Sequence, residues 1–274
     1  MFLAACIQQR SSSDIAHNLD VAEALVRRAA GYGAKLIATP ENTAFLGPQF
    51  HKVETAEPLT GPIAERLRTL AASLGVHLLV GGLAEHRLLK DGRRDPHHCY
   101  NSSVLYGPSG ALLAVYRKLH LFDVDIPGGL TIRESDSICA GDEVVVVDTA
   151  LGTIGMSICY DLRFAELYRQ LVERGANIIA VPSAFTLTTG KDHWHTLLRA
   201  RAIETQCWLL APAQWGQHDR EGKRHSYGHS LIIDPWGIVS ADAGHGEGMA
   251  LAEIDLTRVA AVRRSIPVAQ HRRL

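Results

Sequence analysis

The stretch Gly152-Thr153-Ile154-Gly155-Met156-Ser157-Ile158-Cys159-Tyr160-Asp161-Leu162-Arg163-Phe164 joins a strand pattern to a helix pattern, and the rest of the fold is organised around it. Residues 152–158 mix β-branched, apolar and small side chains, which is typical of a buried strand. After Asp161, apolar residues recur at spacings of three and four until Gly175, as in a helix. We therefore expect Cys159 at the point where a strand turns into a helix.

A cysteine at such a junction can act as a nucleophile. Unpaired backbone N–H groups and the positive end of the helix dipole favour the thiolate over the thiol. The alternative is an inert cysteine in the core, which is the commoner role of a buried cysteine. The strand exit and the neighbouring Tyr160, Asp161 and Arg163 favour the reactive role.

Composition limits the class of protein. The chain has 274 residues, 46% of them hydrophobic and 21% charged, as in a globular protein that can bury a large core. The formal net charge of -1 gives no reason to expect a nucleic acid or a membrane surface as a partner. The five cysteines are scattered, which favours a reducing compartment over a disulfide framework. The apolar stretch at 2–7 is too short for a signal peptide or membrane span, so we expect a cytoplasmic protein.

Strand and helix patterns alternate at both ends of the chain, with hairpins between them. Helices are predicted at 15–30, 63–74, 164–174, 193–205 and 255–265, and strands at 2–8, 35–39, 76–85, 101–106, 111–116, 144–147, 152–158, 177–181, 207–211, 229–233, 238–240 and 249–254. Turn-like residues are expected at 91–98, a long loop at 119–141 and an extended tail after 265. No linker divides the chain, so 1–274 is predicted to be a single α/β domain with two mixed sheets covered by helices.

Two segments resemble each other within the chain. Lys35-Leu-Ile-Ala-Thr-Pro40 and Asn177-Ile-Ile-Ala-Val-Pro182 each follow a helix and a Gly-Ala pair. This similarity indicates two structurally related halves.

Glu41, Lys118 and Cys159 each follow a predicted strand. Ligands of open α/β sheets bind beyond the carboxyl ends of the strands, so side chains at these exits can converge. A cysteine nucleophile needs a proton acceptor, and a carbonyl under attack needs positive charge near its oxygen. A carboxylate, an ammonium and a thiol meet these needs without histidine or metal. Spacing alone does not select Glu41 or Lys118, and either could be an ordinary surface charge.

Three motifs resemble the catalytic motifs of the nitrilase (carbon–nitrogen hydrolase) superfamily, in the same order: Pro40-Glu41-Asn42, 117–124 and 157–164. Further stretches resemble its Nit branch, namely 184–190, 193–204, 227–230, 234–237 and 266–273. The branch contains deaminated-glutathione amidases and ω-amidases. The late motifs are closer to the former, whereas 121–127 also resembles the latter, so the subtype stays open.

The resemblance implies an α-β-β-α sandwich, paired across a helical face into a homodimer or larger homo-oligomer. The tail at about 256–274 is expected to take part in the dimer contacts. The resemblance also implies amide hydrolysis through a thioester: Cys159 attacks, Glu41 is the general base, and Lys118 with the backbone N–H of Tyr160 holds the oxyanion. Glu134 matches the second glutamate of the family, which orients Lys118; the alternative is a solvated loop acid.

Substrates of this branch are α-keto acid amides that carry a carboxylate. Arg163 matches an arginine that binds this carboxylate, which a guanidinium can do with two parallel hydrogen bonds. The alternative is an ion pair of Arg163 with Asp161 or Glu166. Tyr160, Phe185 and Thr189 are expected to line the same pocket. We further expect the positive charge of Lys118 to lower the pKa of the Cys159 thiol.

Other readings have weaker support. His97-His98-Cys99 and His193-Trp194-His195 lack a full ligand set at zinc-like spacing, so no metal and no cofactor are expected. A binding or assembly protein that kept the architecture without chemistry is disfavoured, because every catalytic position holds a suitable residue. Within the enzyme class, the rivals are an ω-amidase, an N-carbamoyl amino acid hydrolase and a true nitrilase. The expected partner is therefore a small-molecule amide.

Overall fold

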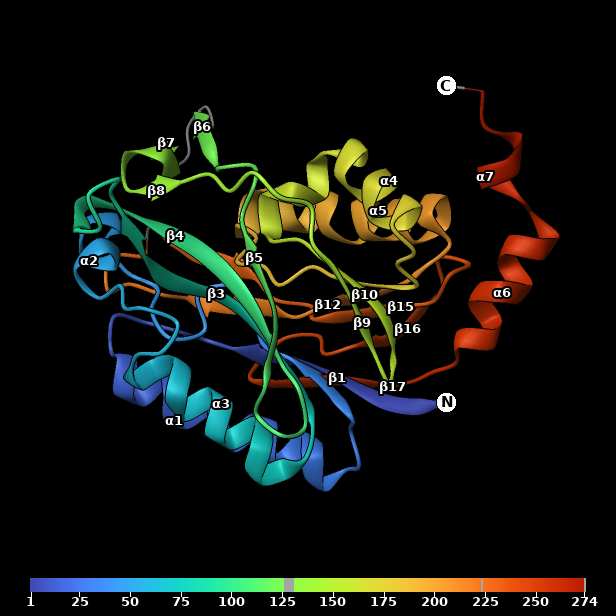
Figure 1. Cartoon of the computed structure of the whole chain (residues 1–274), viewed down its shortest axis with the longest axis horizontal. Helices are drawn as coiled ribbons and strands as arrows, with labels where there is room; N and C mark the ends of the chain where they lie inside the picture. The colour runs from blue at the N-terminus through green and yellow to red at the C-terminus, as the bar shows by residue number, and fades with distance from the viewer. Residues whose placement is uncertain (126–130, 223, 274) are drawn as a thin grey trace.

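Two sheets lie face to face, and helices cover the outer side of each (Figure 1). The computed structural model describes residues 1–125, 131–222 and 224–273. Helices α1 (Ile15–Gly31) and α3 (Pro62–Leu74) cover the first sheet, while α4 (Ala165–Glu173) and α5 (Leu187–Thr205) cover the second. This α-β-β-α order confirms the predicted fold class.

The first sheet has its parallel strands at the centre. Its order is β14-β13-β1-β2-β3-β4-β5, with β17 also paired to β1 and β8 to β4. The bounds are β1 (Phe2–Gln9), β2 (Leu36–Ala38), β3 (His77–Leu88), β4 (Arg94–Tyr106), β5 (Leu112–Arg117), β8 (Ile138–Cys139), β13 (Ala213–Gln217), β14 (His225–Tyr227) and β17 (Gly248–Ile254). Because β1, β2 and β3 are parallel, their carboxyl ends lie at one edge, and the chain reaches Glu41 three residues after β2.

The second sheet repeats this arrangement. Its order is β16-β15-β12-β11-β10-β9, and β10, β11 and β12 are parallel. The bounds are β9 (Val146–Thr149), β10 (Gly152–Met156), β11 (Ile178–Ala180), β12 (Trp208–Ala211), β15 (Leu231–Ile233) and β16 (Val239–Asp242). The carboxyl end of β10 leads to Cys159, and that of β11 leads to Phe185.

The similar segments of the sequence are the central strands β2 and β11, one in each sheet. Their exits approach each other closely at Gly81 of β3. A Cβ on Gly81 would lie 2.3 Å from the Cβ of Pro182 and 2.6 Å from the carbonyl oxygen of Thr39. Glycine at this position therefore lets the exits of the two sheets meet, which is where the candidate site forms.

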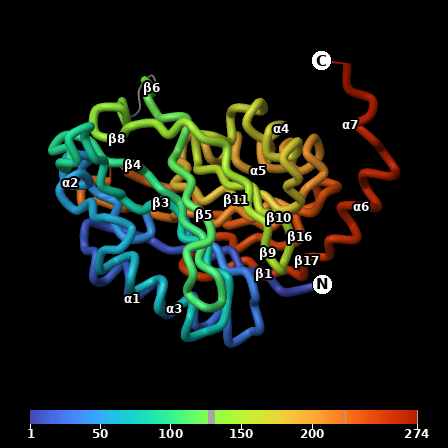
Figure 2. The backbone as a smooth tube through the Cα atoms, viewed as in Figure 1, coloured from blue at the N-terminus to red at the C-terminus, as the bar shows by residue number. Residues whose placement is uncertain are grey.

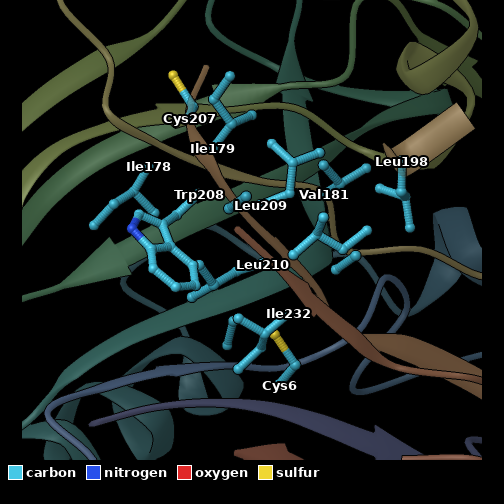
Figure 3. Close-up of a cluster of buried hydrophobic side chains, with 14 of the residues drawn as sticks. Cys6, Ile178, Ile179, Val181, Leu198, Cys207, Trp208, Leu209, Leu210 and Ile232 are labelled. Carbon is cyan, nitrogen blue, oxygen red and sulfur yellow. The ribbon is translucent and has the colours of Figure 1, made fainter. Parts of the chain in front are cut away.

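A shared hydrophobic core lies between the sheets and under α4 and α5. Figure 3 shows part of it, with Trp208, Leu209 and Leu210 of β12 near Ile178 and Ile179 of β11. A second cluster, which includes Leu19, Val26, Leu67 and Leu70, lies between the first sheet and helices α1 and α3. The two clusters bury the apolar faces that the sequence periodicity predicts.

Several local predictions are wrong. Residues 94–98 belong to the long strand β4 and not to a turn, because Arg94 and Cys99 pair with β3 across a register shift. Helix α5 begins at Leu187, six residues before its predicted start, with Thr186 as its N-cap. The short helix α2 (Gln49–Glu54) was not expected at all. The tail is helical at α7 (Val268–His271) and not extended throughout.

The predicted long loop at 119–141 contains short elements. Strands β6 (Asp123–Asp125) and β7 (Thr131–Arg133) pair with each other, and a 3-10 turn, η1 (Glu134–Asp136), follows. Ile126 and Pro127, the end of the segment that resembles the ω-amidases, lie outside the described residues.

The C-terminal helices α6 (Leu256–Ser265) and α7 lie along one end of the two sheets, on the side where the N-terminus also lies (Figure 2). Val259 and Val262 of α6 are buried, whereas Ile266 and Val268 beyond it are about half exposed. The expected role of this segment in dimer contacts stays a prediction. In the part of the chain that the structure describes, no helix is long and apolar enough to cross a membrane.

Candidate active site

Four of the candidate residues converge from separate elements on one cavity of about 810 Å³: Glu41, Lys118, Glu134 and Cys159. The ammonium nitrogen of Lys118 lies 3.0 Å from Oε1 of Glu41 and 2.8 Å from Oε2 of Glu134. Lys118 is 2% exposed and Glu41 3% exposed, so neither is the ordinary surface charge that the sequence left open. Glu134 is buried as well and is not a solvated loop acid.

Cys159 occupies a sharp turn after β10. Its φ is 49°, a left-handed conformation that residues other than glycine adopt rarely and mostly where the surrounding structure enforces it. Its N–H donates to the carbonyl of Pro182 at 3.0 Å, so the exit of β11 helps to hold the turn. The turn places the thiol on the cavity wall together with Glu41 and Lys118.

The segment after Cys159 is a 3-10 turn, η2 (Cys159–Arg163), and α4 begins only at Ala165. The α-helix thus begins within one residue of its predicted start at 164, and the junction at Cys159 itself is a 3-10 turn. The turn still leaves a donor available, because no hydrogen-bond partner is recorded for the N–H of Tyr160 within the described ranges. This N–H follows Cys159 directly in the chain and is suitably located to bind the oxyanion of a carbonyl group that the thiol attacks.

Asp161 connects the turn of Cys159 to the end of β5 that carries Lys118. Its carboxylate is fully buried and accepts hydrogen bonds from the N–H of Ile158 at 2.8 Å, the hydroxyl of Tyr116 at 2.6 Å and the N–H of His120 at 3.0 Å. Asp161 thus fixes the residues beside both Cys159 and Lys118. The sequence suggested Asp161 as a neighbour of Cys159 and as a possible ion-pair partner of Arg163, but not in this role.

Asn101 is a second residue that the sequence did not reveal. Its amide nitrogen donates to Oε1 of Glu41 at 2.9 Å and to Oε1 of Glu134 at 3.3 Å, so it links the two carboxylates that flank Lys118. Gly82 makes room for the pair, because a Cβ there would lie 2.8 Å from Oδ1 of Asn101 and 3.0 Å from Cγ of Glu41. The other oxygen of Glu41 accepts from the N–H of Ala184 at 2.9 Å.

Lys118 and its glutamates form a buried cation–anion cluster. Burial has the largest effect on the pKa of Lys118 and would lower it, but the charges of Glu134 and Glu41 outweigh burial and hold that pKa well above 10.5. Burial would likewise raise the pKa of Glu41, but the charges of Lys118 and Lys52 and the hydrogen bonds bring it below 4.5. At neutral pH, Glu41 is therefore a carboxylate that can accept a proton.

The pKa of Cys159 is raised well above its ordinary value, so the expectation of a thiol acidified by Lys118 is wrong. Burial is the largest cause, and the negative charge of Glu41 adds to it. Together these effects outweigh the favourable charge of Lys118. The cavity therefore holds a neutral thiol beside a carboxylate, so this thiol would have to lose its proton in order to act as a nucleophile.

This arrangement predicts the pH dependence. With Glu41 as the expected general base, kcat/KM should fall only as pH drops through a pKa that lies below 4.5. The charge of Lys118 should persist above pH 10.5. We expect no rise in kcat/KM between about pH 7 and about pH 9, where a free thiol would ionise. A tenfold rise per pH unit in that range would instead indicate attack by a thiolate already present.

The expected substrate-binding residues line the same cavity: Tyr160, Arg163, Phe185 and Thr189. The guanidinium carbon of Arg163 lies 5.2 Å from the centre of the Phe185 ring and 5.9 Å from that of Tyr160. No ion pair of Arg163 is recorded among residues 1–125, 131–222 and 224–273, and Asp161 is engaged elsewhere. The alternative pairing of Arg163 with Asp161 or Glu166 is therefore absent from the described chain, and the guanidinium can take a carboxylate from a ligand.

Metal-ligating side chains gather away from this cavity. Among the described residues, one group of such side chains has its ligand atoms within 4.8 Å of one another: His195, His229 and Asp242. None of the three lines the cavity. Oδ2 of Asp242 lies 3.2 Å from Nε2 of His195, and Oδ1 of Asp242 lies 3.0 Å from Nδ1 of His229. The group is explained by these hydrogen-bonding distances, and no step of the chemistry below involves it.

Comparisons with known proteins show the family of this chain. The family model described as carbon–nitrogen hydrolase matches residues 3–264. The deaminated glutathione amidase of Synechocystis is 44% identical over 99% of this chain and 98% of its own. The human omega-amidase NIT2 is 37% identical over 99% of this chain and 95% of its own. The crystal structure of the C. elegans NitFhit protein matches with a TM-score of 0.89 and 40% identity over 99% of this chain, which spans 65% of that longer protein.

Proposed function

We propose deaminated glutathione, a small amide that carries a carboxylate, as the substrate of this chain, which belongs to the carbon–nitrogen hydrolase family and is an amide-hydrolysing enzyme. The main support for the chemistry is the buried Lys118 between Glu41 and Glu134, beside Cys159 in one cavity. The support for the substrate is the similarity to the deaminated glutathione amidase of Synechocystis and the guanidinium of Arg163, which lies 3.4 Å from Nδ1 of His193 and has no carboxylate partner among the described residues.

In the first half of the reaction, Glu41 takes the proton of the Cys159 thiol as the sulfur bonds to the amide carbon. The carbonyl oxygen becomes an oxyanion, which Lys118 and the N–H of Tyr160 stabilise. Glu41 then gives its proton to the amide nitrogen, the C–N bond breaks, and the amine leaves. The acyl group remains on Cys159 as a thioester.

In the second half, water takes the place of the amine. Glu41 removes a proton from this water as its oxygen bonds to the thioester carbon, and the same donors hold the second oxyanion. The C–S bond breaks, the sulfur regains a proton from Glu41, and the carboxylic acid product leaves. Glu134 and Asn101 keep Lys118 and Glu41 in place throughout.

An ω-amidase acting on α-ketoglutaramate is the second candidate. It is favoured by the 37% identity to the human omega-amidase NIT2 and by the resemblance of residues 121–127 to that class. Both substrates present an α-keto acid amide to Cys159, and they differ in the amine that leaves.

A substrate panel tests the proposal. The rates of amine or ammonia release are compared for deaminated glutathione, α-ketoglutaramate, an N-carbamoyl amino acid and a simple nitrile. We expect the highest kcat/KM for deaminated glutathione. A higher value for α-ketoglutaramate would select the ω-amidase, and a higher value for the carbamoyl compound or the nitrile would refute both.

Location and assembly complete the proposal. The protein works in the cytoplasm, which is supported by its free cysteines Cys6, Cys99, Cys139, Cys159 and Cys207. It forms a homodimer or larger homo-oligomer, which is supported by the exposed apolar side chains of Ile266 and Val268 near the C-terminus.

A further inference from the structure

We propose that Lys52 binds a carboxylate on the amine that leaves, so that the site accepts amides with a carboxylate at each end. The inference rests on the proposed function, because it assigns the part of the substrate beyond the amide nitrogen. Nothing in the sequence motifs singles out Lys52, which lies on the unexpected helix α2.

Lys52 is a buried cation in the wall of the reaction cavity. It is 7% exposed and lines the cavity together with Glu41 and Cys159. Its ammonium donates to Oδ1 of Asn42 at 2.6 Å, and no ion pair of Lys52 is recorded in the described part of the chain. The charge of Lys52 acts on Glu41 and lowers its pKa, but the two do not form an ion pair in direct contact. An ammonium has three N–H donors, and a buried charge is stabilised by a hydrogen-bonded anionic partner. Lys52 is thus suited to an anionic group that enters the cavity.

The other cations of the cavity differ from Lys52 in their partners. Lys118 is held by its two glutamates, and Arg133 lies 2.5 Å from Oδ2 of Asp125. Arg224 donates to the carbonyl of Gly47. Lys52, Arg163 and Arg224 are therefore the cavity-lining cations that have no ion pair with a carboxylate among the described residues, and of these Lys52 and Arg163 are the ones held beside Glu41 and Cys159. Two such cations fit a ligand with two carboxylates.

The chemistry assigns one carboxylate to each cation. The leaving nitrogen receives its proton from Glu41, so the leaving amine lies on the Glu41 side of the amide carbon. Lys52 is on that side, because its partner Asn42 is the residue next to Glu41. Arg163 belongs to the turn of Cys159 and contacts the ring of Phe185, so it faces the acyl side. A cavity of about 810 Å³ is large enough for an amide extended in both directions.

Deaminated glutathione has this form. Its acyl part carries the α-keto carboxylate, and its leaving amine is cysteinylglycine, which ends in a second carboxylate. In α-ketoglutaramate the acyl part is the same, but the leaving group is ammonia. Lys52 therefore distinguishes the two candidate substrates, whereas Arg163 binds what they share.

The test compares KM and kcat of Lys52→Met, Lys52→Arg and Arg163→Lys with the unchanged enzyme on both substrates. Loss of a charge-assisted hydrogen bond in Lys52→Met should raise the ratio of KM for deaminated glutathione to KM for α-ketoglutaramate by about tenfold or more. Any effect of Lys52 on the basicity of Glu41 acts on both substrates and cancels in this ratio. Lys52→Arg should keep the ratio within about threefold, because the charge remains. Arg163→Lys should raise both KM values and leave the ratio nearly unchanged.

A ratio that stays the same in a folded Lys52→Met variant would overturn the proposal and leave Lys52 as a residue that tunes Glu41. If this variant fails to fold, the unchanged enzyme is assayed with the carboxamide analogue of deaminated glutathione at the glycine end. We expect its KM to be about tenfold higher, and an equal KM would overturn the proposal.

Failure of the proposed function is recognised separately. If the unchanged enzyme hydrolyses neither substrate, the Kd of deaminated glutathione is measured by calorimetry for Cys159→Ala with and without Lys52→Met. Weaker binding in the double variant supports the role of Lys52. Equal binding, or no binding to Cys159→Ala itself, overturns it.

Discussion

Replacement of Cys159 with alanine is expected to abolish hydrolysis of deaminated glutathione and to leave the fold intact. The mechanism has no substitute for the sulfur, because no other thiol lines the cavity in the described part of the chain. Removal of a nucleophile typically lowers kcat by about a millionfold, so the residual rate should lie below detection. The structural cost is small, because the variant removes a single sulfur atom from the cavity wall.

The measurement is the release of cysteinylglycine over hours, together with far-UV circular dichroism of the purified variant. Cys139→Ala is the matched control, since Cys139 is a half-buried free cysteine that does not line the cavity. The control should keep kcat within about twofold, as expected for a substitution away from the reacting atoms. Turnover by a folded Cys159→Ala protein would refute the role of this thiol.

Replacement of Glu41 with glutamine should lower kcat by about a thousandfold, within the usual range for loss of a general base. The amide keeps the shape of the carboxylate and can still accept from Lys118 with its oxygen, but it cannot take the proton of a thiol whose pKa is raised by burial. A general base acts mainly in the transition state, so we expect KM to change much less than kcat.

Glu85→Gln serves as the control for this prediction. Glu85 is also a buried glutamate with a cationic partner, Arg117 at 2.6 Å, but it does not line the cavity. Its loss should lower the thermal midpoint Tm and change kcat by less than about threefold. If Glu41→Gln keeps kcat within about tenfold of the unchanged enzyme, Glu41 is not the general base.

Much of the fold and of the candidate site could be predicted from the sequence, because both depend on local sequence patterns. The change from strand to helix periodicity around Cys159 indicated the turn that places the thiol on the cavity wall, although the first residues of this turn form η2 and not an α-helix. The repeated segment ending in Pro40 and Pro182 indicated two related strand exits, and these exits meet at Gly81. The family motifs then selected Glu41 and Lys118 from many other charged residues.

What could not be predicted depends on residues that meet only after folding. Asn101 lies within a strand pattern, and nothing in its neighbourhood shows that it will link Glu41 to Glu134. Helix α2 is six residues long, which is too short for a clear hydrophobic periodicity. The sequence therefore did not indicate that Lys52 lies on a helix beside the cavity. The prediction that the pKa of Cys159 is lowered was wrong for the same reason. The local sequence indicates the turn, but it does not reveal the burial of the thiol or the nearby charge of Glu41, which together raise this pKa.

The central claim is a covalent acyl group on Cys159 during turnover, and rapid-quench mass spectrometry of the enzyme tests it most directly. The enzyme is mixed with deaminated glutathione, quenched in acid at successive times, and digested before analysis. A thioester intermediate predicts a peptide containing Cys159 that carries the α-ketoglutaryl group, with the same added mass when α-ketoglutaramate is the substrate. Steady release of cysteinylglycine with no acyl group on Cys159 at any quench time, or with the acyl group on another cysteine, would contradict it.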